Sequence, residues 1–229
     1  MDYRKRLDEI QDRIAAACAR AGRNAQDVTI VAVTKYIGAD ETEALVRAGQ
    51  FDLGENRMQV AAPKLEHLAA QELAVRWHYI GSLQTNKVKE VAGHFHLIHS
   101  LDRSSLATAI QKRAEQIGQV VPCLVQVNVS GEESKSGLVP DEVPAFLKTV
   151  REMDRIELRG YMTMAPNVDD PEQTRAVFRG LRELRDEMLA SGIAPATATE
   201  LSMGMSGDFE VAVEEGATLV RIGSILVKP

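Results

Sequence analysis

The segment VTIVAVTKYIGADE, residues 28–41, contains the pattern that decides the fold. Its run of apolar and β-branched residues predicts a buried strand over 28–34, and the acidic residues after Gly38 predict the start of a helix. Lys35 lies between the two, at the carboxyl end of the strand. The segment therefore predicts one strand–helix unit with an ammonium group at the tip of the strand.

The same alternation of short apolar runs and longer amphipathic stretches continues along the chain. It predicts eight strands, at residues 28–34, 51–55, 76–81, 96–100, 122–129, 157–164, 199–203 and 218–223. Helical patterns fill the connections, at residues 40–49, 56–70, 85–93, 103–118, 141–153, 171–191 and 207–216, and a further helix covers 3–21. Because each connection contains a helix, we expect the strands to pair in parallel.

Eight strands joined by right-handed helical crossovers in 229 residues fit a closed (β/α)8 TIM barrel with an additional N-terminal helix. Strands that are apolar throughout favour a sheet covered on both faces. An open doubly wound sheet is the structural alternative. No linker rich in Pro, Gly or Ser interrupts the pattern, so we expect residues 1–229 to form a single domain.

Composition narrows the classes of function. The 27 basic and 33 acidic residues give a net charge of −6, which argues against general attraction to nucleic acid or anionic membranes. No apolar run approaches the ~18 residues of a membrane span, and residues 1–22 lack the apolar core of a signal peptide, so a cytoplasmic location is expected. Cys18 and Cys123 are expected to be reduced core residues. A small ligand is the favoured partner.

Lys35 is the first candidate site residue. In a barrel of this kind, functional side chains gather at the carboxyl ends of the strands, which places Lys35 at the mouth. Burial there would disfavour the ammonium form and leave a neutral amine that attacks an aldehyde or ketone. A solvated loop lysine is the alternative that position alone leaves open.

Two turns near the C-terminus suggest a phosphate site. After the strand at 199–203, the segment LSMGMSGDFE places Ser206 where it is expected to cap the next helix, although a well-capped helix needs no ligand. The last strand ends at Gly223 and Ser224, and barrels often hold phosphate in the loops after strands seven and eight. An amine and a phosphate cradle on one rim match pyridoxal 5′-phosphate (PLP).

Arg221 precedes Gly223 by two residues, so the two share a strand face and the arginine is expected to point into the barrel. A buried guanidinium stays charged and needs partners. An arginine on the helix-facing side of the strand is the alternative.

Eight motifs occur in order along nearly the whole chain: VAVTKY, GENRMQV, WHYIGSLQTNKVK, SLDR, VNVSGEESKSGL, GYMTMAP, LSMGMSGD and VRIGS. The chain thereby resembles the YggS/PROSC family of pyridoxal phosphate homeostasis proteins. The resemblance implies a barrel like the N-terminal domain of alanine racemase, with Lys35 as the Schiff-base lysine. It also implies that Asn56 lines the cofactor and Arg221 faces the pyridine nitrogen, while the phosphate is surrounded by Ser206, Gly223 and Ser224.

The chain departs from the family pattern at two places. Where the family has GENYVQE, this chain has Arg57 and Val60, and the closing IGTAIFG is IGSILVKP here. Ser224 keeps a hydroxyl in place of threonine, so we expect phosphate binding to persist. Arg57, Val60 and the altered tail are expected to change the outer wall of the pocket.

The resemblance implies a carrier that stores or delivers PLP rather than a catalyst. An arginine facing the pyridine nitrogen leaves it unprotonated and therefore a poorer electron sink, which weakens most transamination or elimination chemistry while leaving racemisation possible. Racemisation needs an acid/base group opposite the lysine, which alanine racemases take from a second domain and a partner subunit, and the chain stops at Pro229. Packing is the favoured role for the three candidate phenols, Tyr36, Tyr79 and Tyr161. A slow PLP-dependent amino-acid racemase and a cofactor-free Schiff-base aldolase stay open as alternatives.

Three further expectations concern exchange, partners and metals. Lys135, in the loop SGEESKSGL, is expected to help hand the aldehyde in or out, with a solvated loop lysine as the alternative. Apo forms of PLP-dependent enzymes are candidate recipients, and the family resemblance suggests a monomer. His94, His96 and His99 are not expected to bind a metal, because strand alternation points His99 away from the other two.

Overall fold

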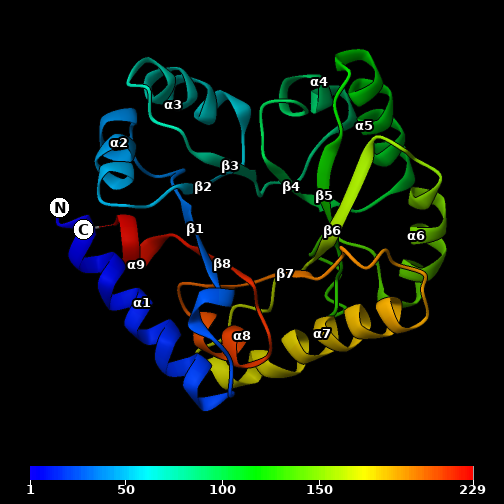
Figure 1. The fold of residues 1–229 in the computed structure, drawn as a ribbon. Coiled ribbons are helices and arrows are strands. Elements are labelled where there is room, and N and C mark those ends of the chain that lie inside the picture. The colour runs from blue at the N-terminus through cyan, green and yellow to red at the C-terminus, as the bar shows by residue number, and fades with distance from the viewer. Residues whose placement is uncertain (229) are drawn as a thin grey trace.

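The computed structural model describes residues 1–228 and contains eight parallel strands in a closed barrel (Figure 1). In chain order they are β1 (Thr29–Val33), β2 (Asp52–Glu55), β3 (Arg76–Tyr79), β4 (Leu97–Leu101), β5 (Val121–Gln126), β6 (Ile156–Met162), β7 (Glu200–Met205) and β8 (Leu219–Ile222). Each strand pairs with its neighbour in the sequence, and β8 pairs with β1 to close the barrel. The predicted barrel is confirmed, and the open-sheet alternative is wrong.

Helices connect successive strands and surround the barrel (Figure 1). They are α2 (Ala39–Arg47), α3 (Met58–Ala70), α4 (Val88–Val91), α5 (Ser104–Ile117), α6 (Val143–Arg151), α7 (Arg175–Ala190) and α8 (Phe209–Glu214). Short 3-10 turns precede three of them, namely η2 (Thr85–Lys87), η3 (Pro140–Glu142) and η4 (Pro171–Thr174). Two short elements were not predicted, the turn η1 (Ala25–Asp27) and the helix α9 (Ser224–Val227).

The N-terminal helix α1 (Tyr3–Arg20) completes the ring of helices. Its buried residues, which include Leu7, Ile10 and Ile14, repeat at a spacing of three and four, as in an amphipathic helix. It packs against α8, α9 and α2. Because α9 has only four residues, α1 takes the place of a full-length helix after β8.

The barrel separates an outer core, between strands and helices, from a smaller inner one. The inner apolar cluster consists of Val31, Leu97, Leu124, Met162 and Leu219. The outer core includes both cysteines, which are buried and free, as predicted. Eight polar side chains also lie on the strands, each no more than 6% exposed: Asp52, Glu55, His78, His99, Ser100, Gln126, Ser202 and Arg221. Buried polar groups need hydrogen-bond partners, so these side chains are expected to bond to one another or to the backbone.

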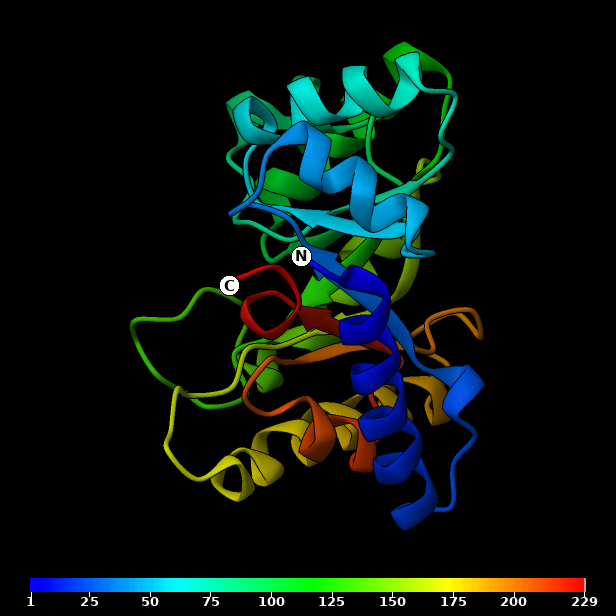
Figure 2. The same cartoon turned by 90° about the vertical axis from the view of Figure 1, so that its left-hand side faces the viewer.

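The carboxyl ends of all strands form one rim, because the strands are parallel. Seen from the side, the C-terminal segment and the long loops after β5 and β6 project on the same side of the barrel (Figure 2). Among the helices of residues 1–228, none combines the length and apolar character needed to cross a membrane.

Candidate active-site rim

The ends of β1, β2, β7 and β8 bring the predicted residues to one part of the rim. Lys35 follows β1, Asn56 follows β2, and Ser206 follows β7. The N–H of Gly223, directly after β8, donates to Ser206 Oγ at 3.1 Å. A Cβ atom added to Gly223 would lie 3.4 Å from Val33 Cβ at the end of β1. These contacts join the ends of β7, β8 and β1 closely enough for one small molecule to reach all three.

Lys35 lies exposed at this rim rather than buried. Its Nζ is 4.8 Å from the centroid of the Tyr36 ring, and the Nζ of Lys228 lies over the same ring at 4.5 Å. The burial predicted from the sequence is therefore wrong, because the strand buries Thr34 and the chain turns outward at the next residue. Lys35 is an accessible amine, and its desolvation depends on the ligand that covers it.

Ser206 does not cap α8, contrary to the sequence prediction. The helix starts at Phe209, and the preceding residue is Asp208, whose Oδ1 accepts from the N–H of Met205 at 2.6 Å. Burial raises the pKa of Asp208, and the bond from Met205 opposes this effect. Since Asp208 closes the turn, the Ser206 hydroxyl is used instead to link the loops after β7 and β8.

These two loops contain a set of hydrogen-bond donors. Within residues 1–228, no protein acceptor is bonded by the backbone N–H groups of Ser206, Gly207, Ser224 and Ile225. The Ser224 hydroxyl, at the exposed start of α9, has no bonded partner in this part of the chain either. Several amides and hydroxyls on two adjoining loops suit an anion with several oxygens. The donor set therefore fits the predicted phosphate.

Arg221 points into the barrel, as predicted, and is 5% exposed. Its Nη1 donates to Ser202 Oγ at 2.6 Å, and its Nη2 donates to the carbonyl oxygen of Thr163 at 3.0 Å. Burial lowers the pKa of Arg221 to about 10, although Asp208 acts in the opposite direction. The guanidinium is therefore charged at neutral pH while both of its hydrogen-bond partners are neutral.

A buried ion pair below the rim was missed by the sequence analysis. Glu55 Oε1 accepts from Lys64 Nζ and from Thr34 Oγ1, both at 2.6 Å. Lys64 also donates to the carbonyl oxygen of Thr34 at 2.7 Å. These bonds fix the residues directly before Lys35 and Asn56. The available signal was a carboxylate at the end of a buried strand, followed by a lysine on the buried face of α3.

Asn56 lines a polar cavity of 440 Å³ at the rim, together with Arg57 and Lys87. A Cβ atom on Gly81 would lie 2.3 Å from the carbonyl oxygen of Asn56, so only glycine lets the chain after β3 pass this close. Arg57, at which the chain departs from the family pattern, therefore lines a cavity that adjoins Asn56.

The remaining candidates lie apart from Lys35 or are already paired. Lys135 donates to the carbonyl oxygen of Ala165 and forms an ion pair with Glu132 at 3.0 Å, so it is not a freely solvated lysine. Tyr161 is completely buried in the outer core, and burial raises the pKa of its phenol. Of the three histidines, only His99 lies on β4.

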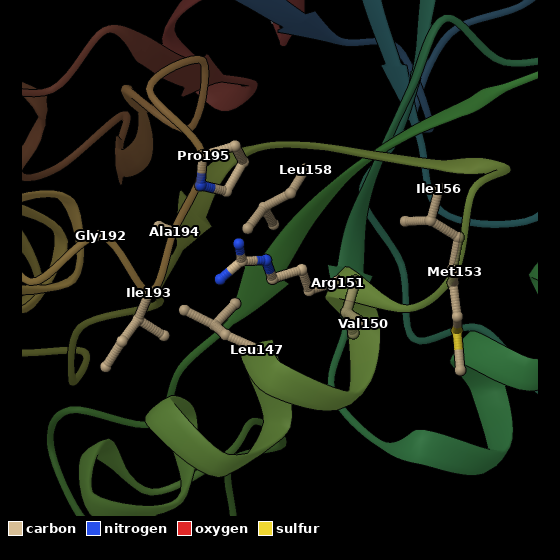
Figure 3. Close-up of a pocket in the computed structure, with 10 residues that line it drawn as sticks. All are labelled: Leu147, Val150, Arg151, Met153, Ile156, Leu158, Gly192, Ile193, Ala194 and Pro195. Atoms are coloured by element: carbon tan, nitrogen blue, oxygen red, sulfur yellow. The ribbon is translucent and has the colours of Figure 1, made fainter.

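A cavity of 280 Å³ lies at the opposite end of the barrel, between the end of α6, the start of β6 and the loop before β7 (Figure 3). Arg151 is the one charged residue among those that line it, and apolar residues such as Leu147 and Ile193 form most of its wall. It contains neither a lysine nor an acidic group. The rim is therefore the better candidate for an aldehyde and a phosphate.

Comparison with known proteins agrees with the fold. The family described as "Alanine racemase, N-terminal domain" matches residues 6–229, so the fold and rim define a barrel of this class. More specifically, the chain belongs to the family of pyridoxal phosphate homeostasis proteins. It is 43% identical to the Pyridoxal phosphate homeostasis protein of Aquifex aeolicus, over 99% of this chain and 97% of the relative. The protein of that name from Pseudomonas aeruginosa is 40% identical, over 96% and 92%.

Solved structures give the same result. PipY of Synechococcus elongatus, solved with PLP bound, superposes with a TM-score of 0.81 at 32% identity, over 95% of this chain and 99% of PipY. Alanine racemase of Clostridium difficile shares the fold, with a TM-score of 0.73 at 17% identity, over 98% of this chain and 56% of the racemase.

Proposed function

We propose that this protein binds PLP as a Schiff base on Lys35 and serves intracellular PLP homeostasis by storing or delivering it. The observation that supports the proposal is the junction of three strand ends, where Gly223 contacts both Ser206 and Val33, the residue two before Lys35. PLP has an aldehyde and a phosphate on one flat ring, so a single molecule matches both groups. The PLP-bound structure of PipY supports the same ligand.

Each site residue then has a distinct task. PLP, when bound, supplies an aldehyde and a pyridine ring whose electron-withdrawing power depends on protonation of its nitrogen. Lys35 provides the amine, Ser206, Gly223 and Ser224 hold the phosphate, and Asn56 lines the ring. Arg221 donates a hydrogen bond to the pyridine nitrogen and keeps its own proton, because a guanidinium that is charged at neutral pH is a far weaker acid than a pyridinium.

These tasks favour a carrier over a catalyst. Without a protonated ring nitrogen, the cofactor stabilises a carbanion poorly. An acid opposite Lys35 is also required for racemisation, and the buried phenol of Tyr161 does not meet this need. Turnover of alanine or serine enantiomers that disappears in Lys35→Ala would favour the racemase alternative.

Titration of the unloaded protein with PLP tests the binding proposal. We expect a visible absorption band of the imine in the wild type, and loss of that band in Lys35→Ala. Lys89→Ala is the matched control, because Lys89 is an exposed lysine on α4. A band of wild-type intensity in Lys35→Ala would contradict the assignment of the lysine, and no binding in the wild type would contradict PLP as the ligand.

Delivery requires a route off Lys35, and we propose that Lys135 takes part in it. This lysine connects the loops after β5 and β6 through Ala165 and Glu132. Lys135→Ala is expected to slow transfer of PLP to an apo-enzyme severalfold without abolishing the adduct on Lys35. Transfer rates equal to those of Lys89→Ala would rule out this role. Apo PLP-dependent enzymes as recipients, a monomeric state and a cytoplasmic location belong to the same proposal.

A further inference from the structure

A line of hydrogen bonds crosses the barrel interior from Arg221 to Asp52. Arg221 Nη1 lies 2.6 Å from Ser202 Oγ, which lies 2.8 Å from His99 Nδ1. His99 Nε2 is 2.9 Å from His78 Nδ1, and His78 Nε2 is 3.0 Å from Asp52 Oδ1. The five residues come from β8, β7, β4, β3 and β2, so the line connects the strand that carries the site arginine with the opposite mouth of the barrel.

The order of the protons along this line follows from its two ends. Asp52 accepts only, so neutral His78 must carry its proton on Nε2 and present a bare Nδ1. His99 then donates from Nε2 and presents a bare Nδ1 to Ser202. At the other end, Arg221 donates only, so Ser202 Oγ accepts from it and uses its own proton for His99. Asp52 and Arg221 thus require the same direction of hydrogen-bond donation along the line, and every proton in the line has an acceptor.

The surroundings of His99 favour its neutral form. Burial lowers the pKa of His99 well below its usual value, and the positive charge of Arg221 acts in the same direction. Burial raises the pKa of Asp52, but hydrogen bonds from His78 and Arg76 outweigh it, so the pKa is lowered overall. Asp52 is therefore an anion at neutral pH.

We propose that Ser202 and His99 are positioning residues that hold the Arg221 guanidinium in one orientation for the pyridine nitrogen, and that His78 and Asp52 fix the tautomer of His99. That PLP is the ligand rests on the function proposed above. The positions of the protons along the line do not depend on any ligand. A serine hydroxyl left alone rotates among partners. Once it donates to His99, its lone pair stays directed at Arg221.

The first test needs no cofactor. Long-range ¹⁵N–¹H NMR spectra of the wild-type protein report the tautomer and charge of each imidazole. We expect His99 and His78 both to be neutral with the proton on Nε2 at pH 7. A protonated ring, or a proton on Nδ1 of either residue, would overturn the proposed order whether or not PLP binds.

The second test compares PLP dissociation constants of substitutions at one position. His99→Leu is expected to weaken binding about tenfold, because the hydrogen bond that aligns a charged donor is lost. His99→Asn is expected to restore wild-type affinity, since its Oδ1 occupies the place of Nδ1 and needs no tautomer partner. His96→Leu is the control, because the ring of His96 contacts that of His78 from outside the line. Wild-type affinity in His99→Leu, or an equal loss in His99→Asn, would overturn the positioning role.

Discussion

Polar groups in the interior of the barrel are bonded to one another, whereas polar groups at the rim are exposed or without a bonded protein partner. Inside, Arg221, His99 and Ser202 are buried and bonded to one another in a continuous line. At the rim, Lys35 and Ser224 are exposed, and the amides of two loops have no protein acceptor within residues 1–228. Under the proposed function, this difference means that Arg221 is held in place before the ligand binds, whereas the groups at the rim stay available for it. Changes inside should therefore cost stability as well as the alignment of Arg221, whereas changes at the rim should cost binding alone.

The largest expected effect is on the ion pair that separates the two regions. Lys64→Met leaves Glu55, which is completely buried, without its counter-ion, and we expect the free energy of unfolding to fall by about 4 kcal/mol. Chemical denaturation measures this change. The double variant Glu55→Gln/Lys64→Met should recover most of the loss, and Lys89→Met should stay within about 0.5 kcal/mol of the wild type. Equal stability of Lys64→Met and Lys89→Met would contradict a buried pair.

The next effect concerns pH and the interior line. Because the folded pKa of His99 is far below 6.5, the unfolded chain binds a proton between pH 6.5 and 5 that the folded chain does not bind. Stability therefore falls as the pH is lowered, and the part due to His99 steepens from half of about 1.4 kcal/mol per pH unit at pH 6.5 toward that full value near pH 5. Unfolding curves of the wild type and His99→Asn between pH 6.5 and 5 measure it. The wild type should lose stability more steeply by this amount, and parallel curves would show that His99 is not a buried neutral imidazole.

The smallest expected effect on stability is at the rim. Ser224→Ala removes a hydroxyl that has no bonded protein partner within residues 1–228, so thermal unfolding of the unloaded protein should be unchanged. Its dissociation constant for PLP should rise about tenfold, because a hydrogen bond to a charged phosphate is lost. Ser224→Thr should bind like the wild type. A PLP affinity unaffected by Ser224→Ala would remove this residue from the phosphate site.

Most of the fold was predictable from sequence because the strands are short, apolar and separated by long amphipathic stretches. Local deviations were not predictable. The helix α9 has four residues, too few to show a period, and Pro140 and Pro171 begin the 3-10 turns that split two predicted helices. For β4, the predicted range 96–100 is shifted by one residue from the observed Leu97–Leu101.

The sequence was sufficient to predict that the candidate site residues lie at the ends of strands. It was not sufficient to predict their contacts. Ser206 resembled a helix cap because small polar residues precede α8, whereas Asp208, two residues later, closes that turn. The bond between His99 and Ser202 joins residues 103 apart in the sequence, and only the closed barrel brings them together. A signal was nevertheless present, since His78 is a polar residue between Trp77 and Tyr79 in a buried strand.

The covalent position of the cofactor tests the central claim most directly. The wild-type protein is saturated with PLP, reduced with borohydride, digested and mapped by mass spectrometry. We predict a single stoichiometric phosphopyridoxyl adduct on Lys35. An unmodified Lys35 at saturation, or an adduct mainly on Lys64, Lys87 or Lys135, would contradict the assignment of the rim as the PLP site.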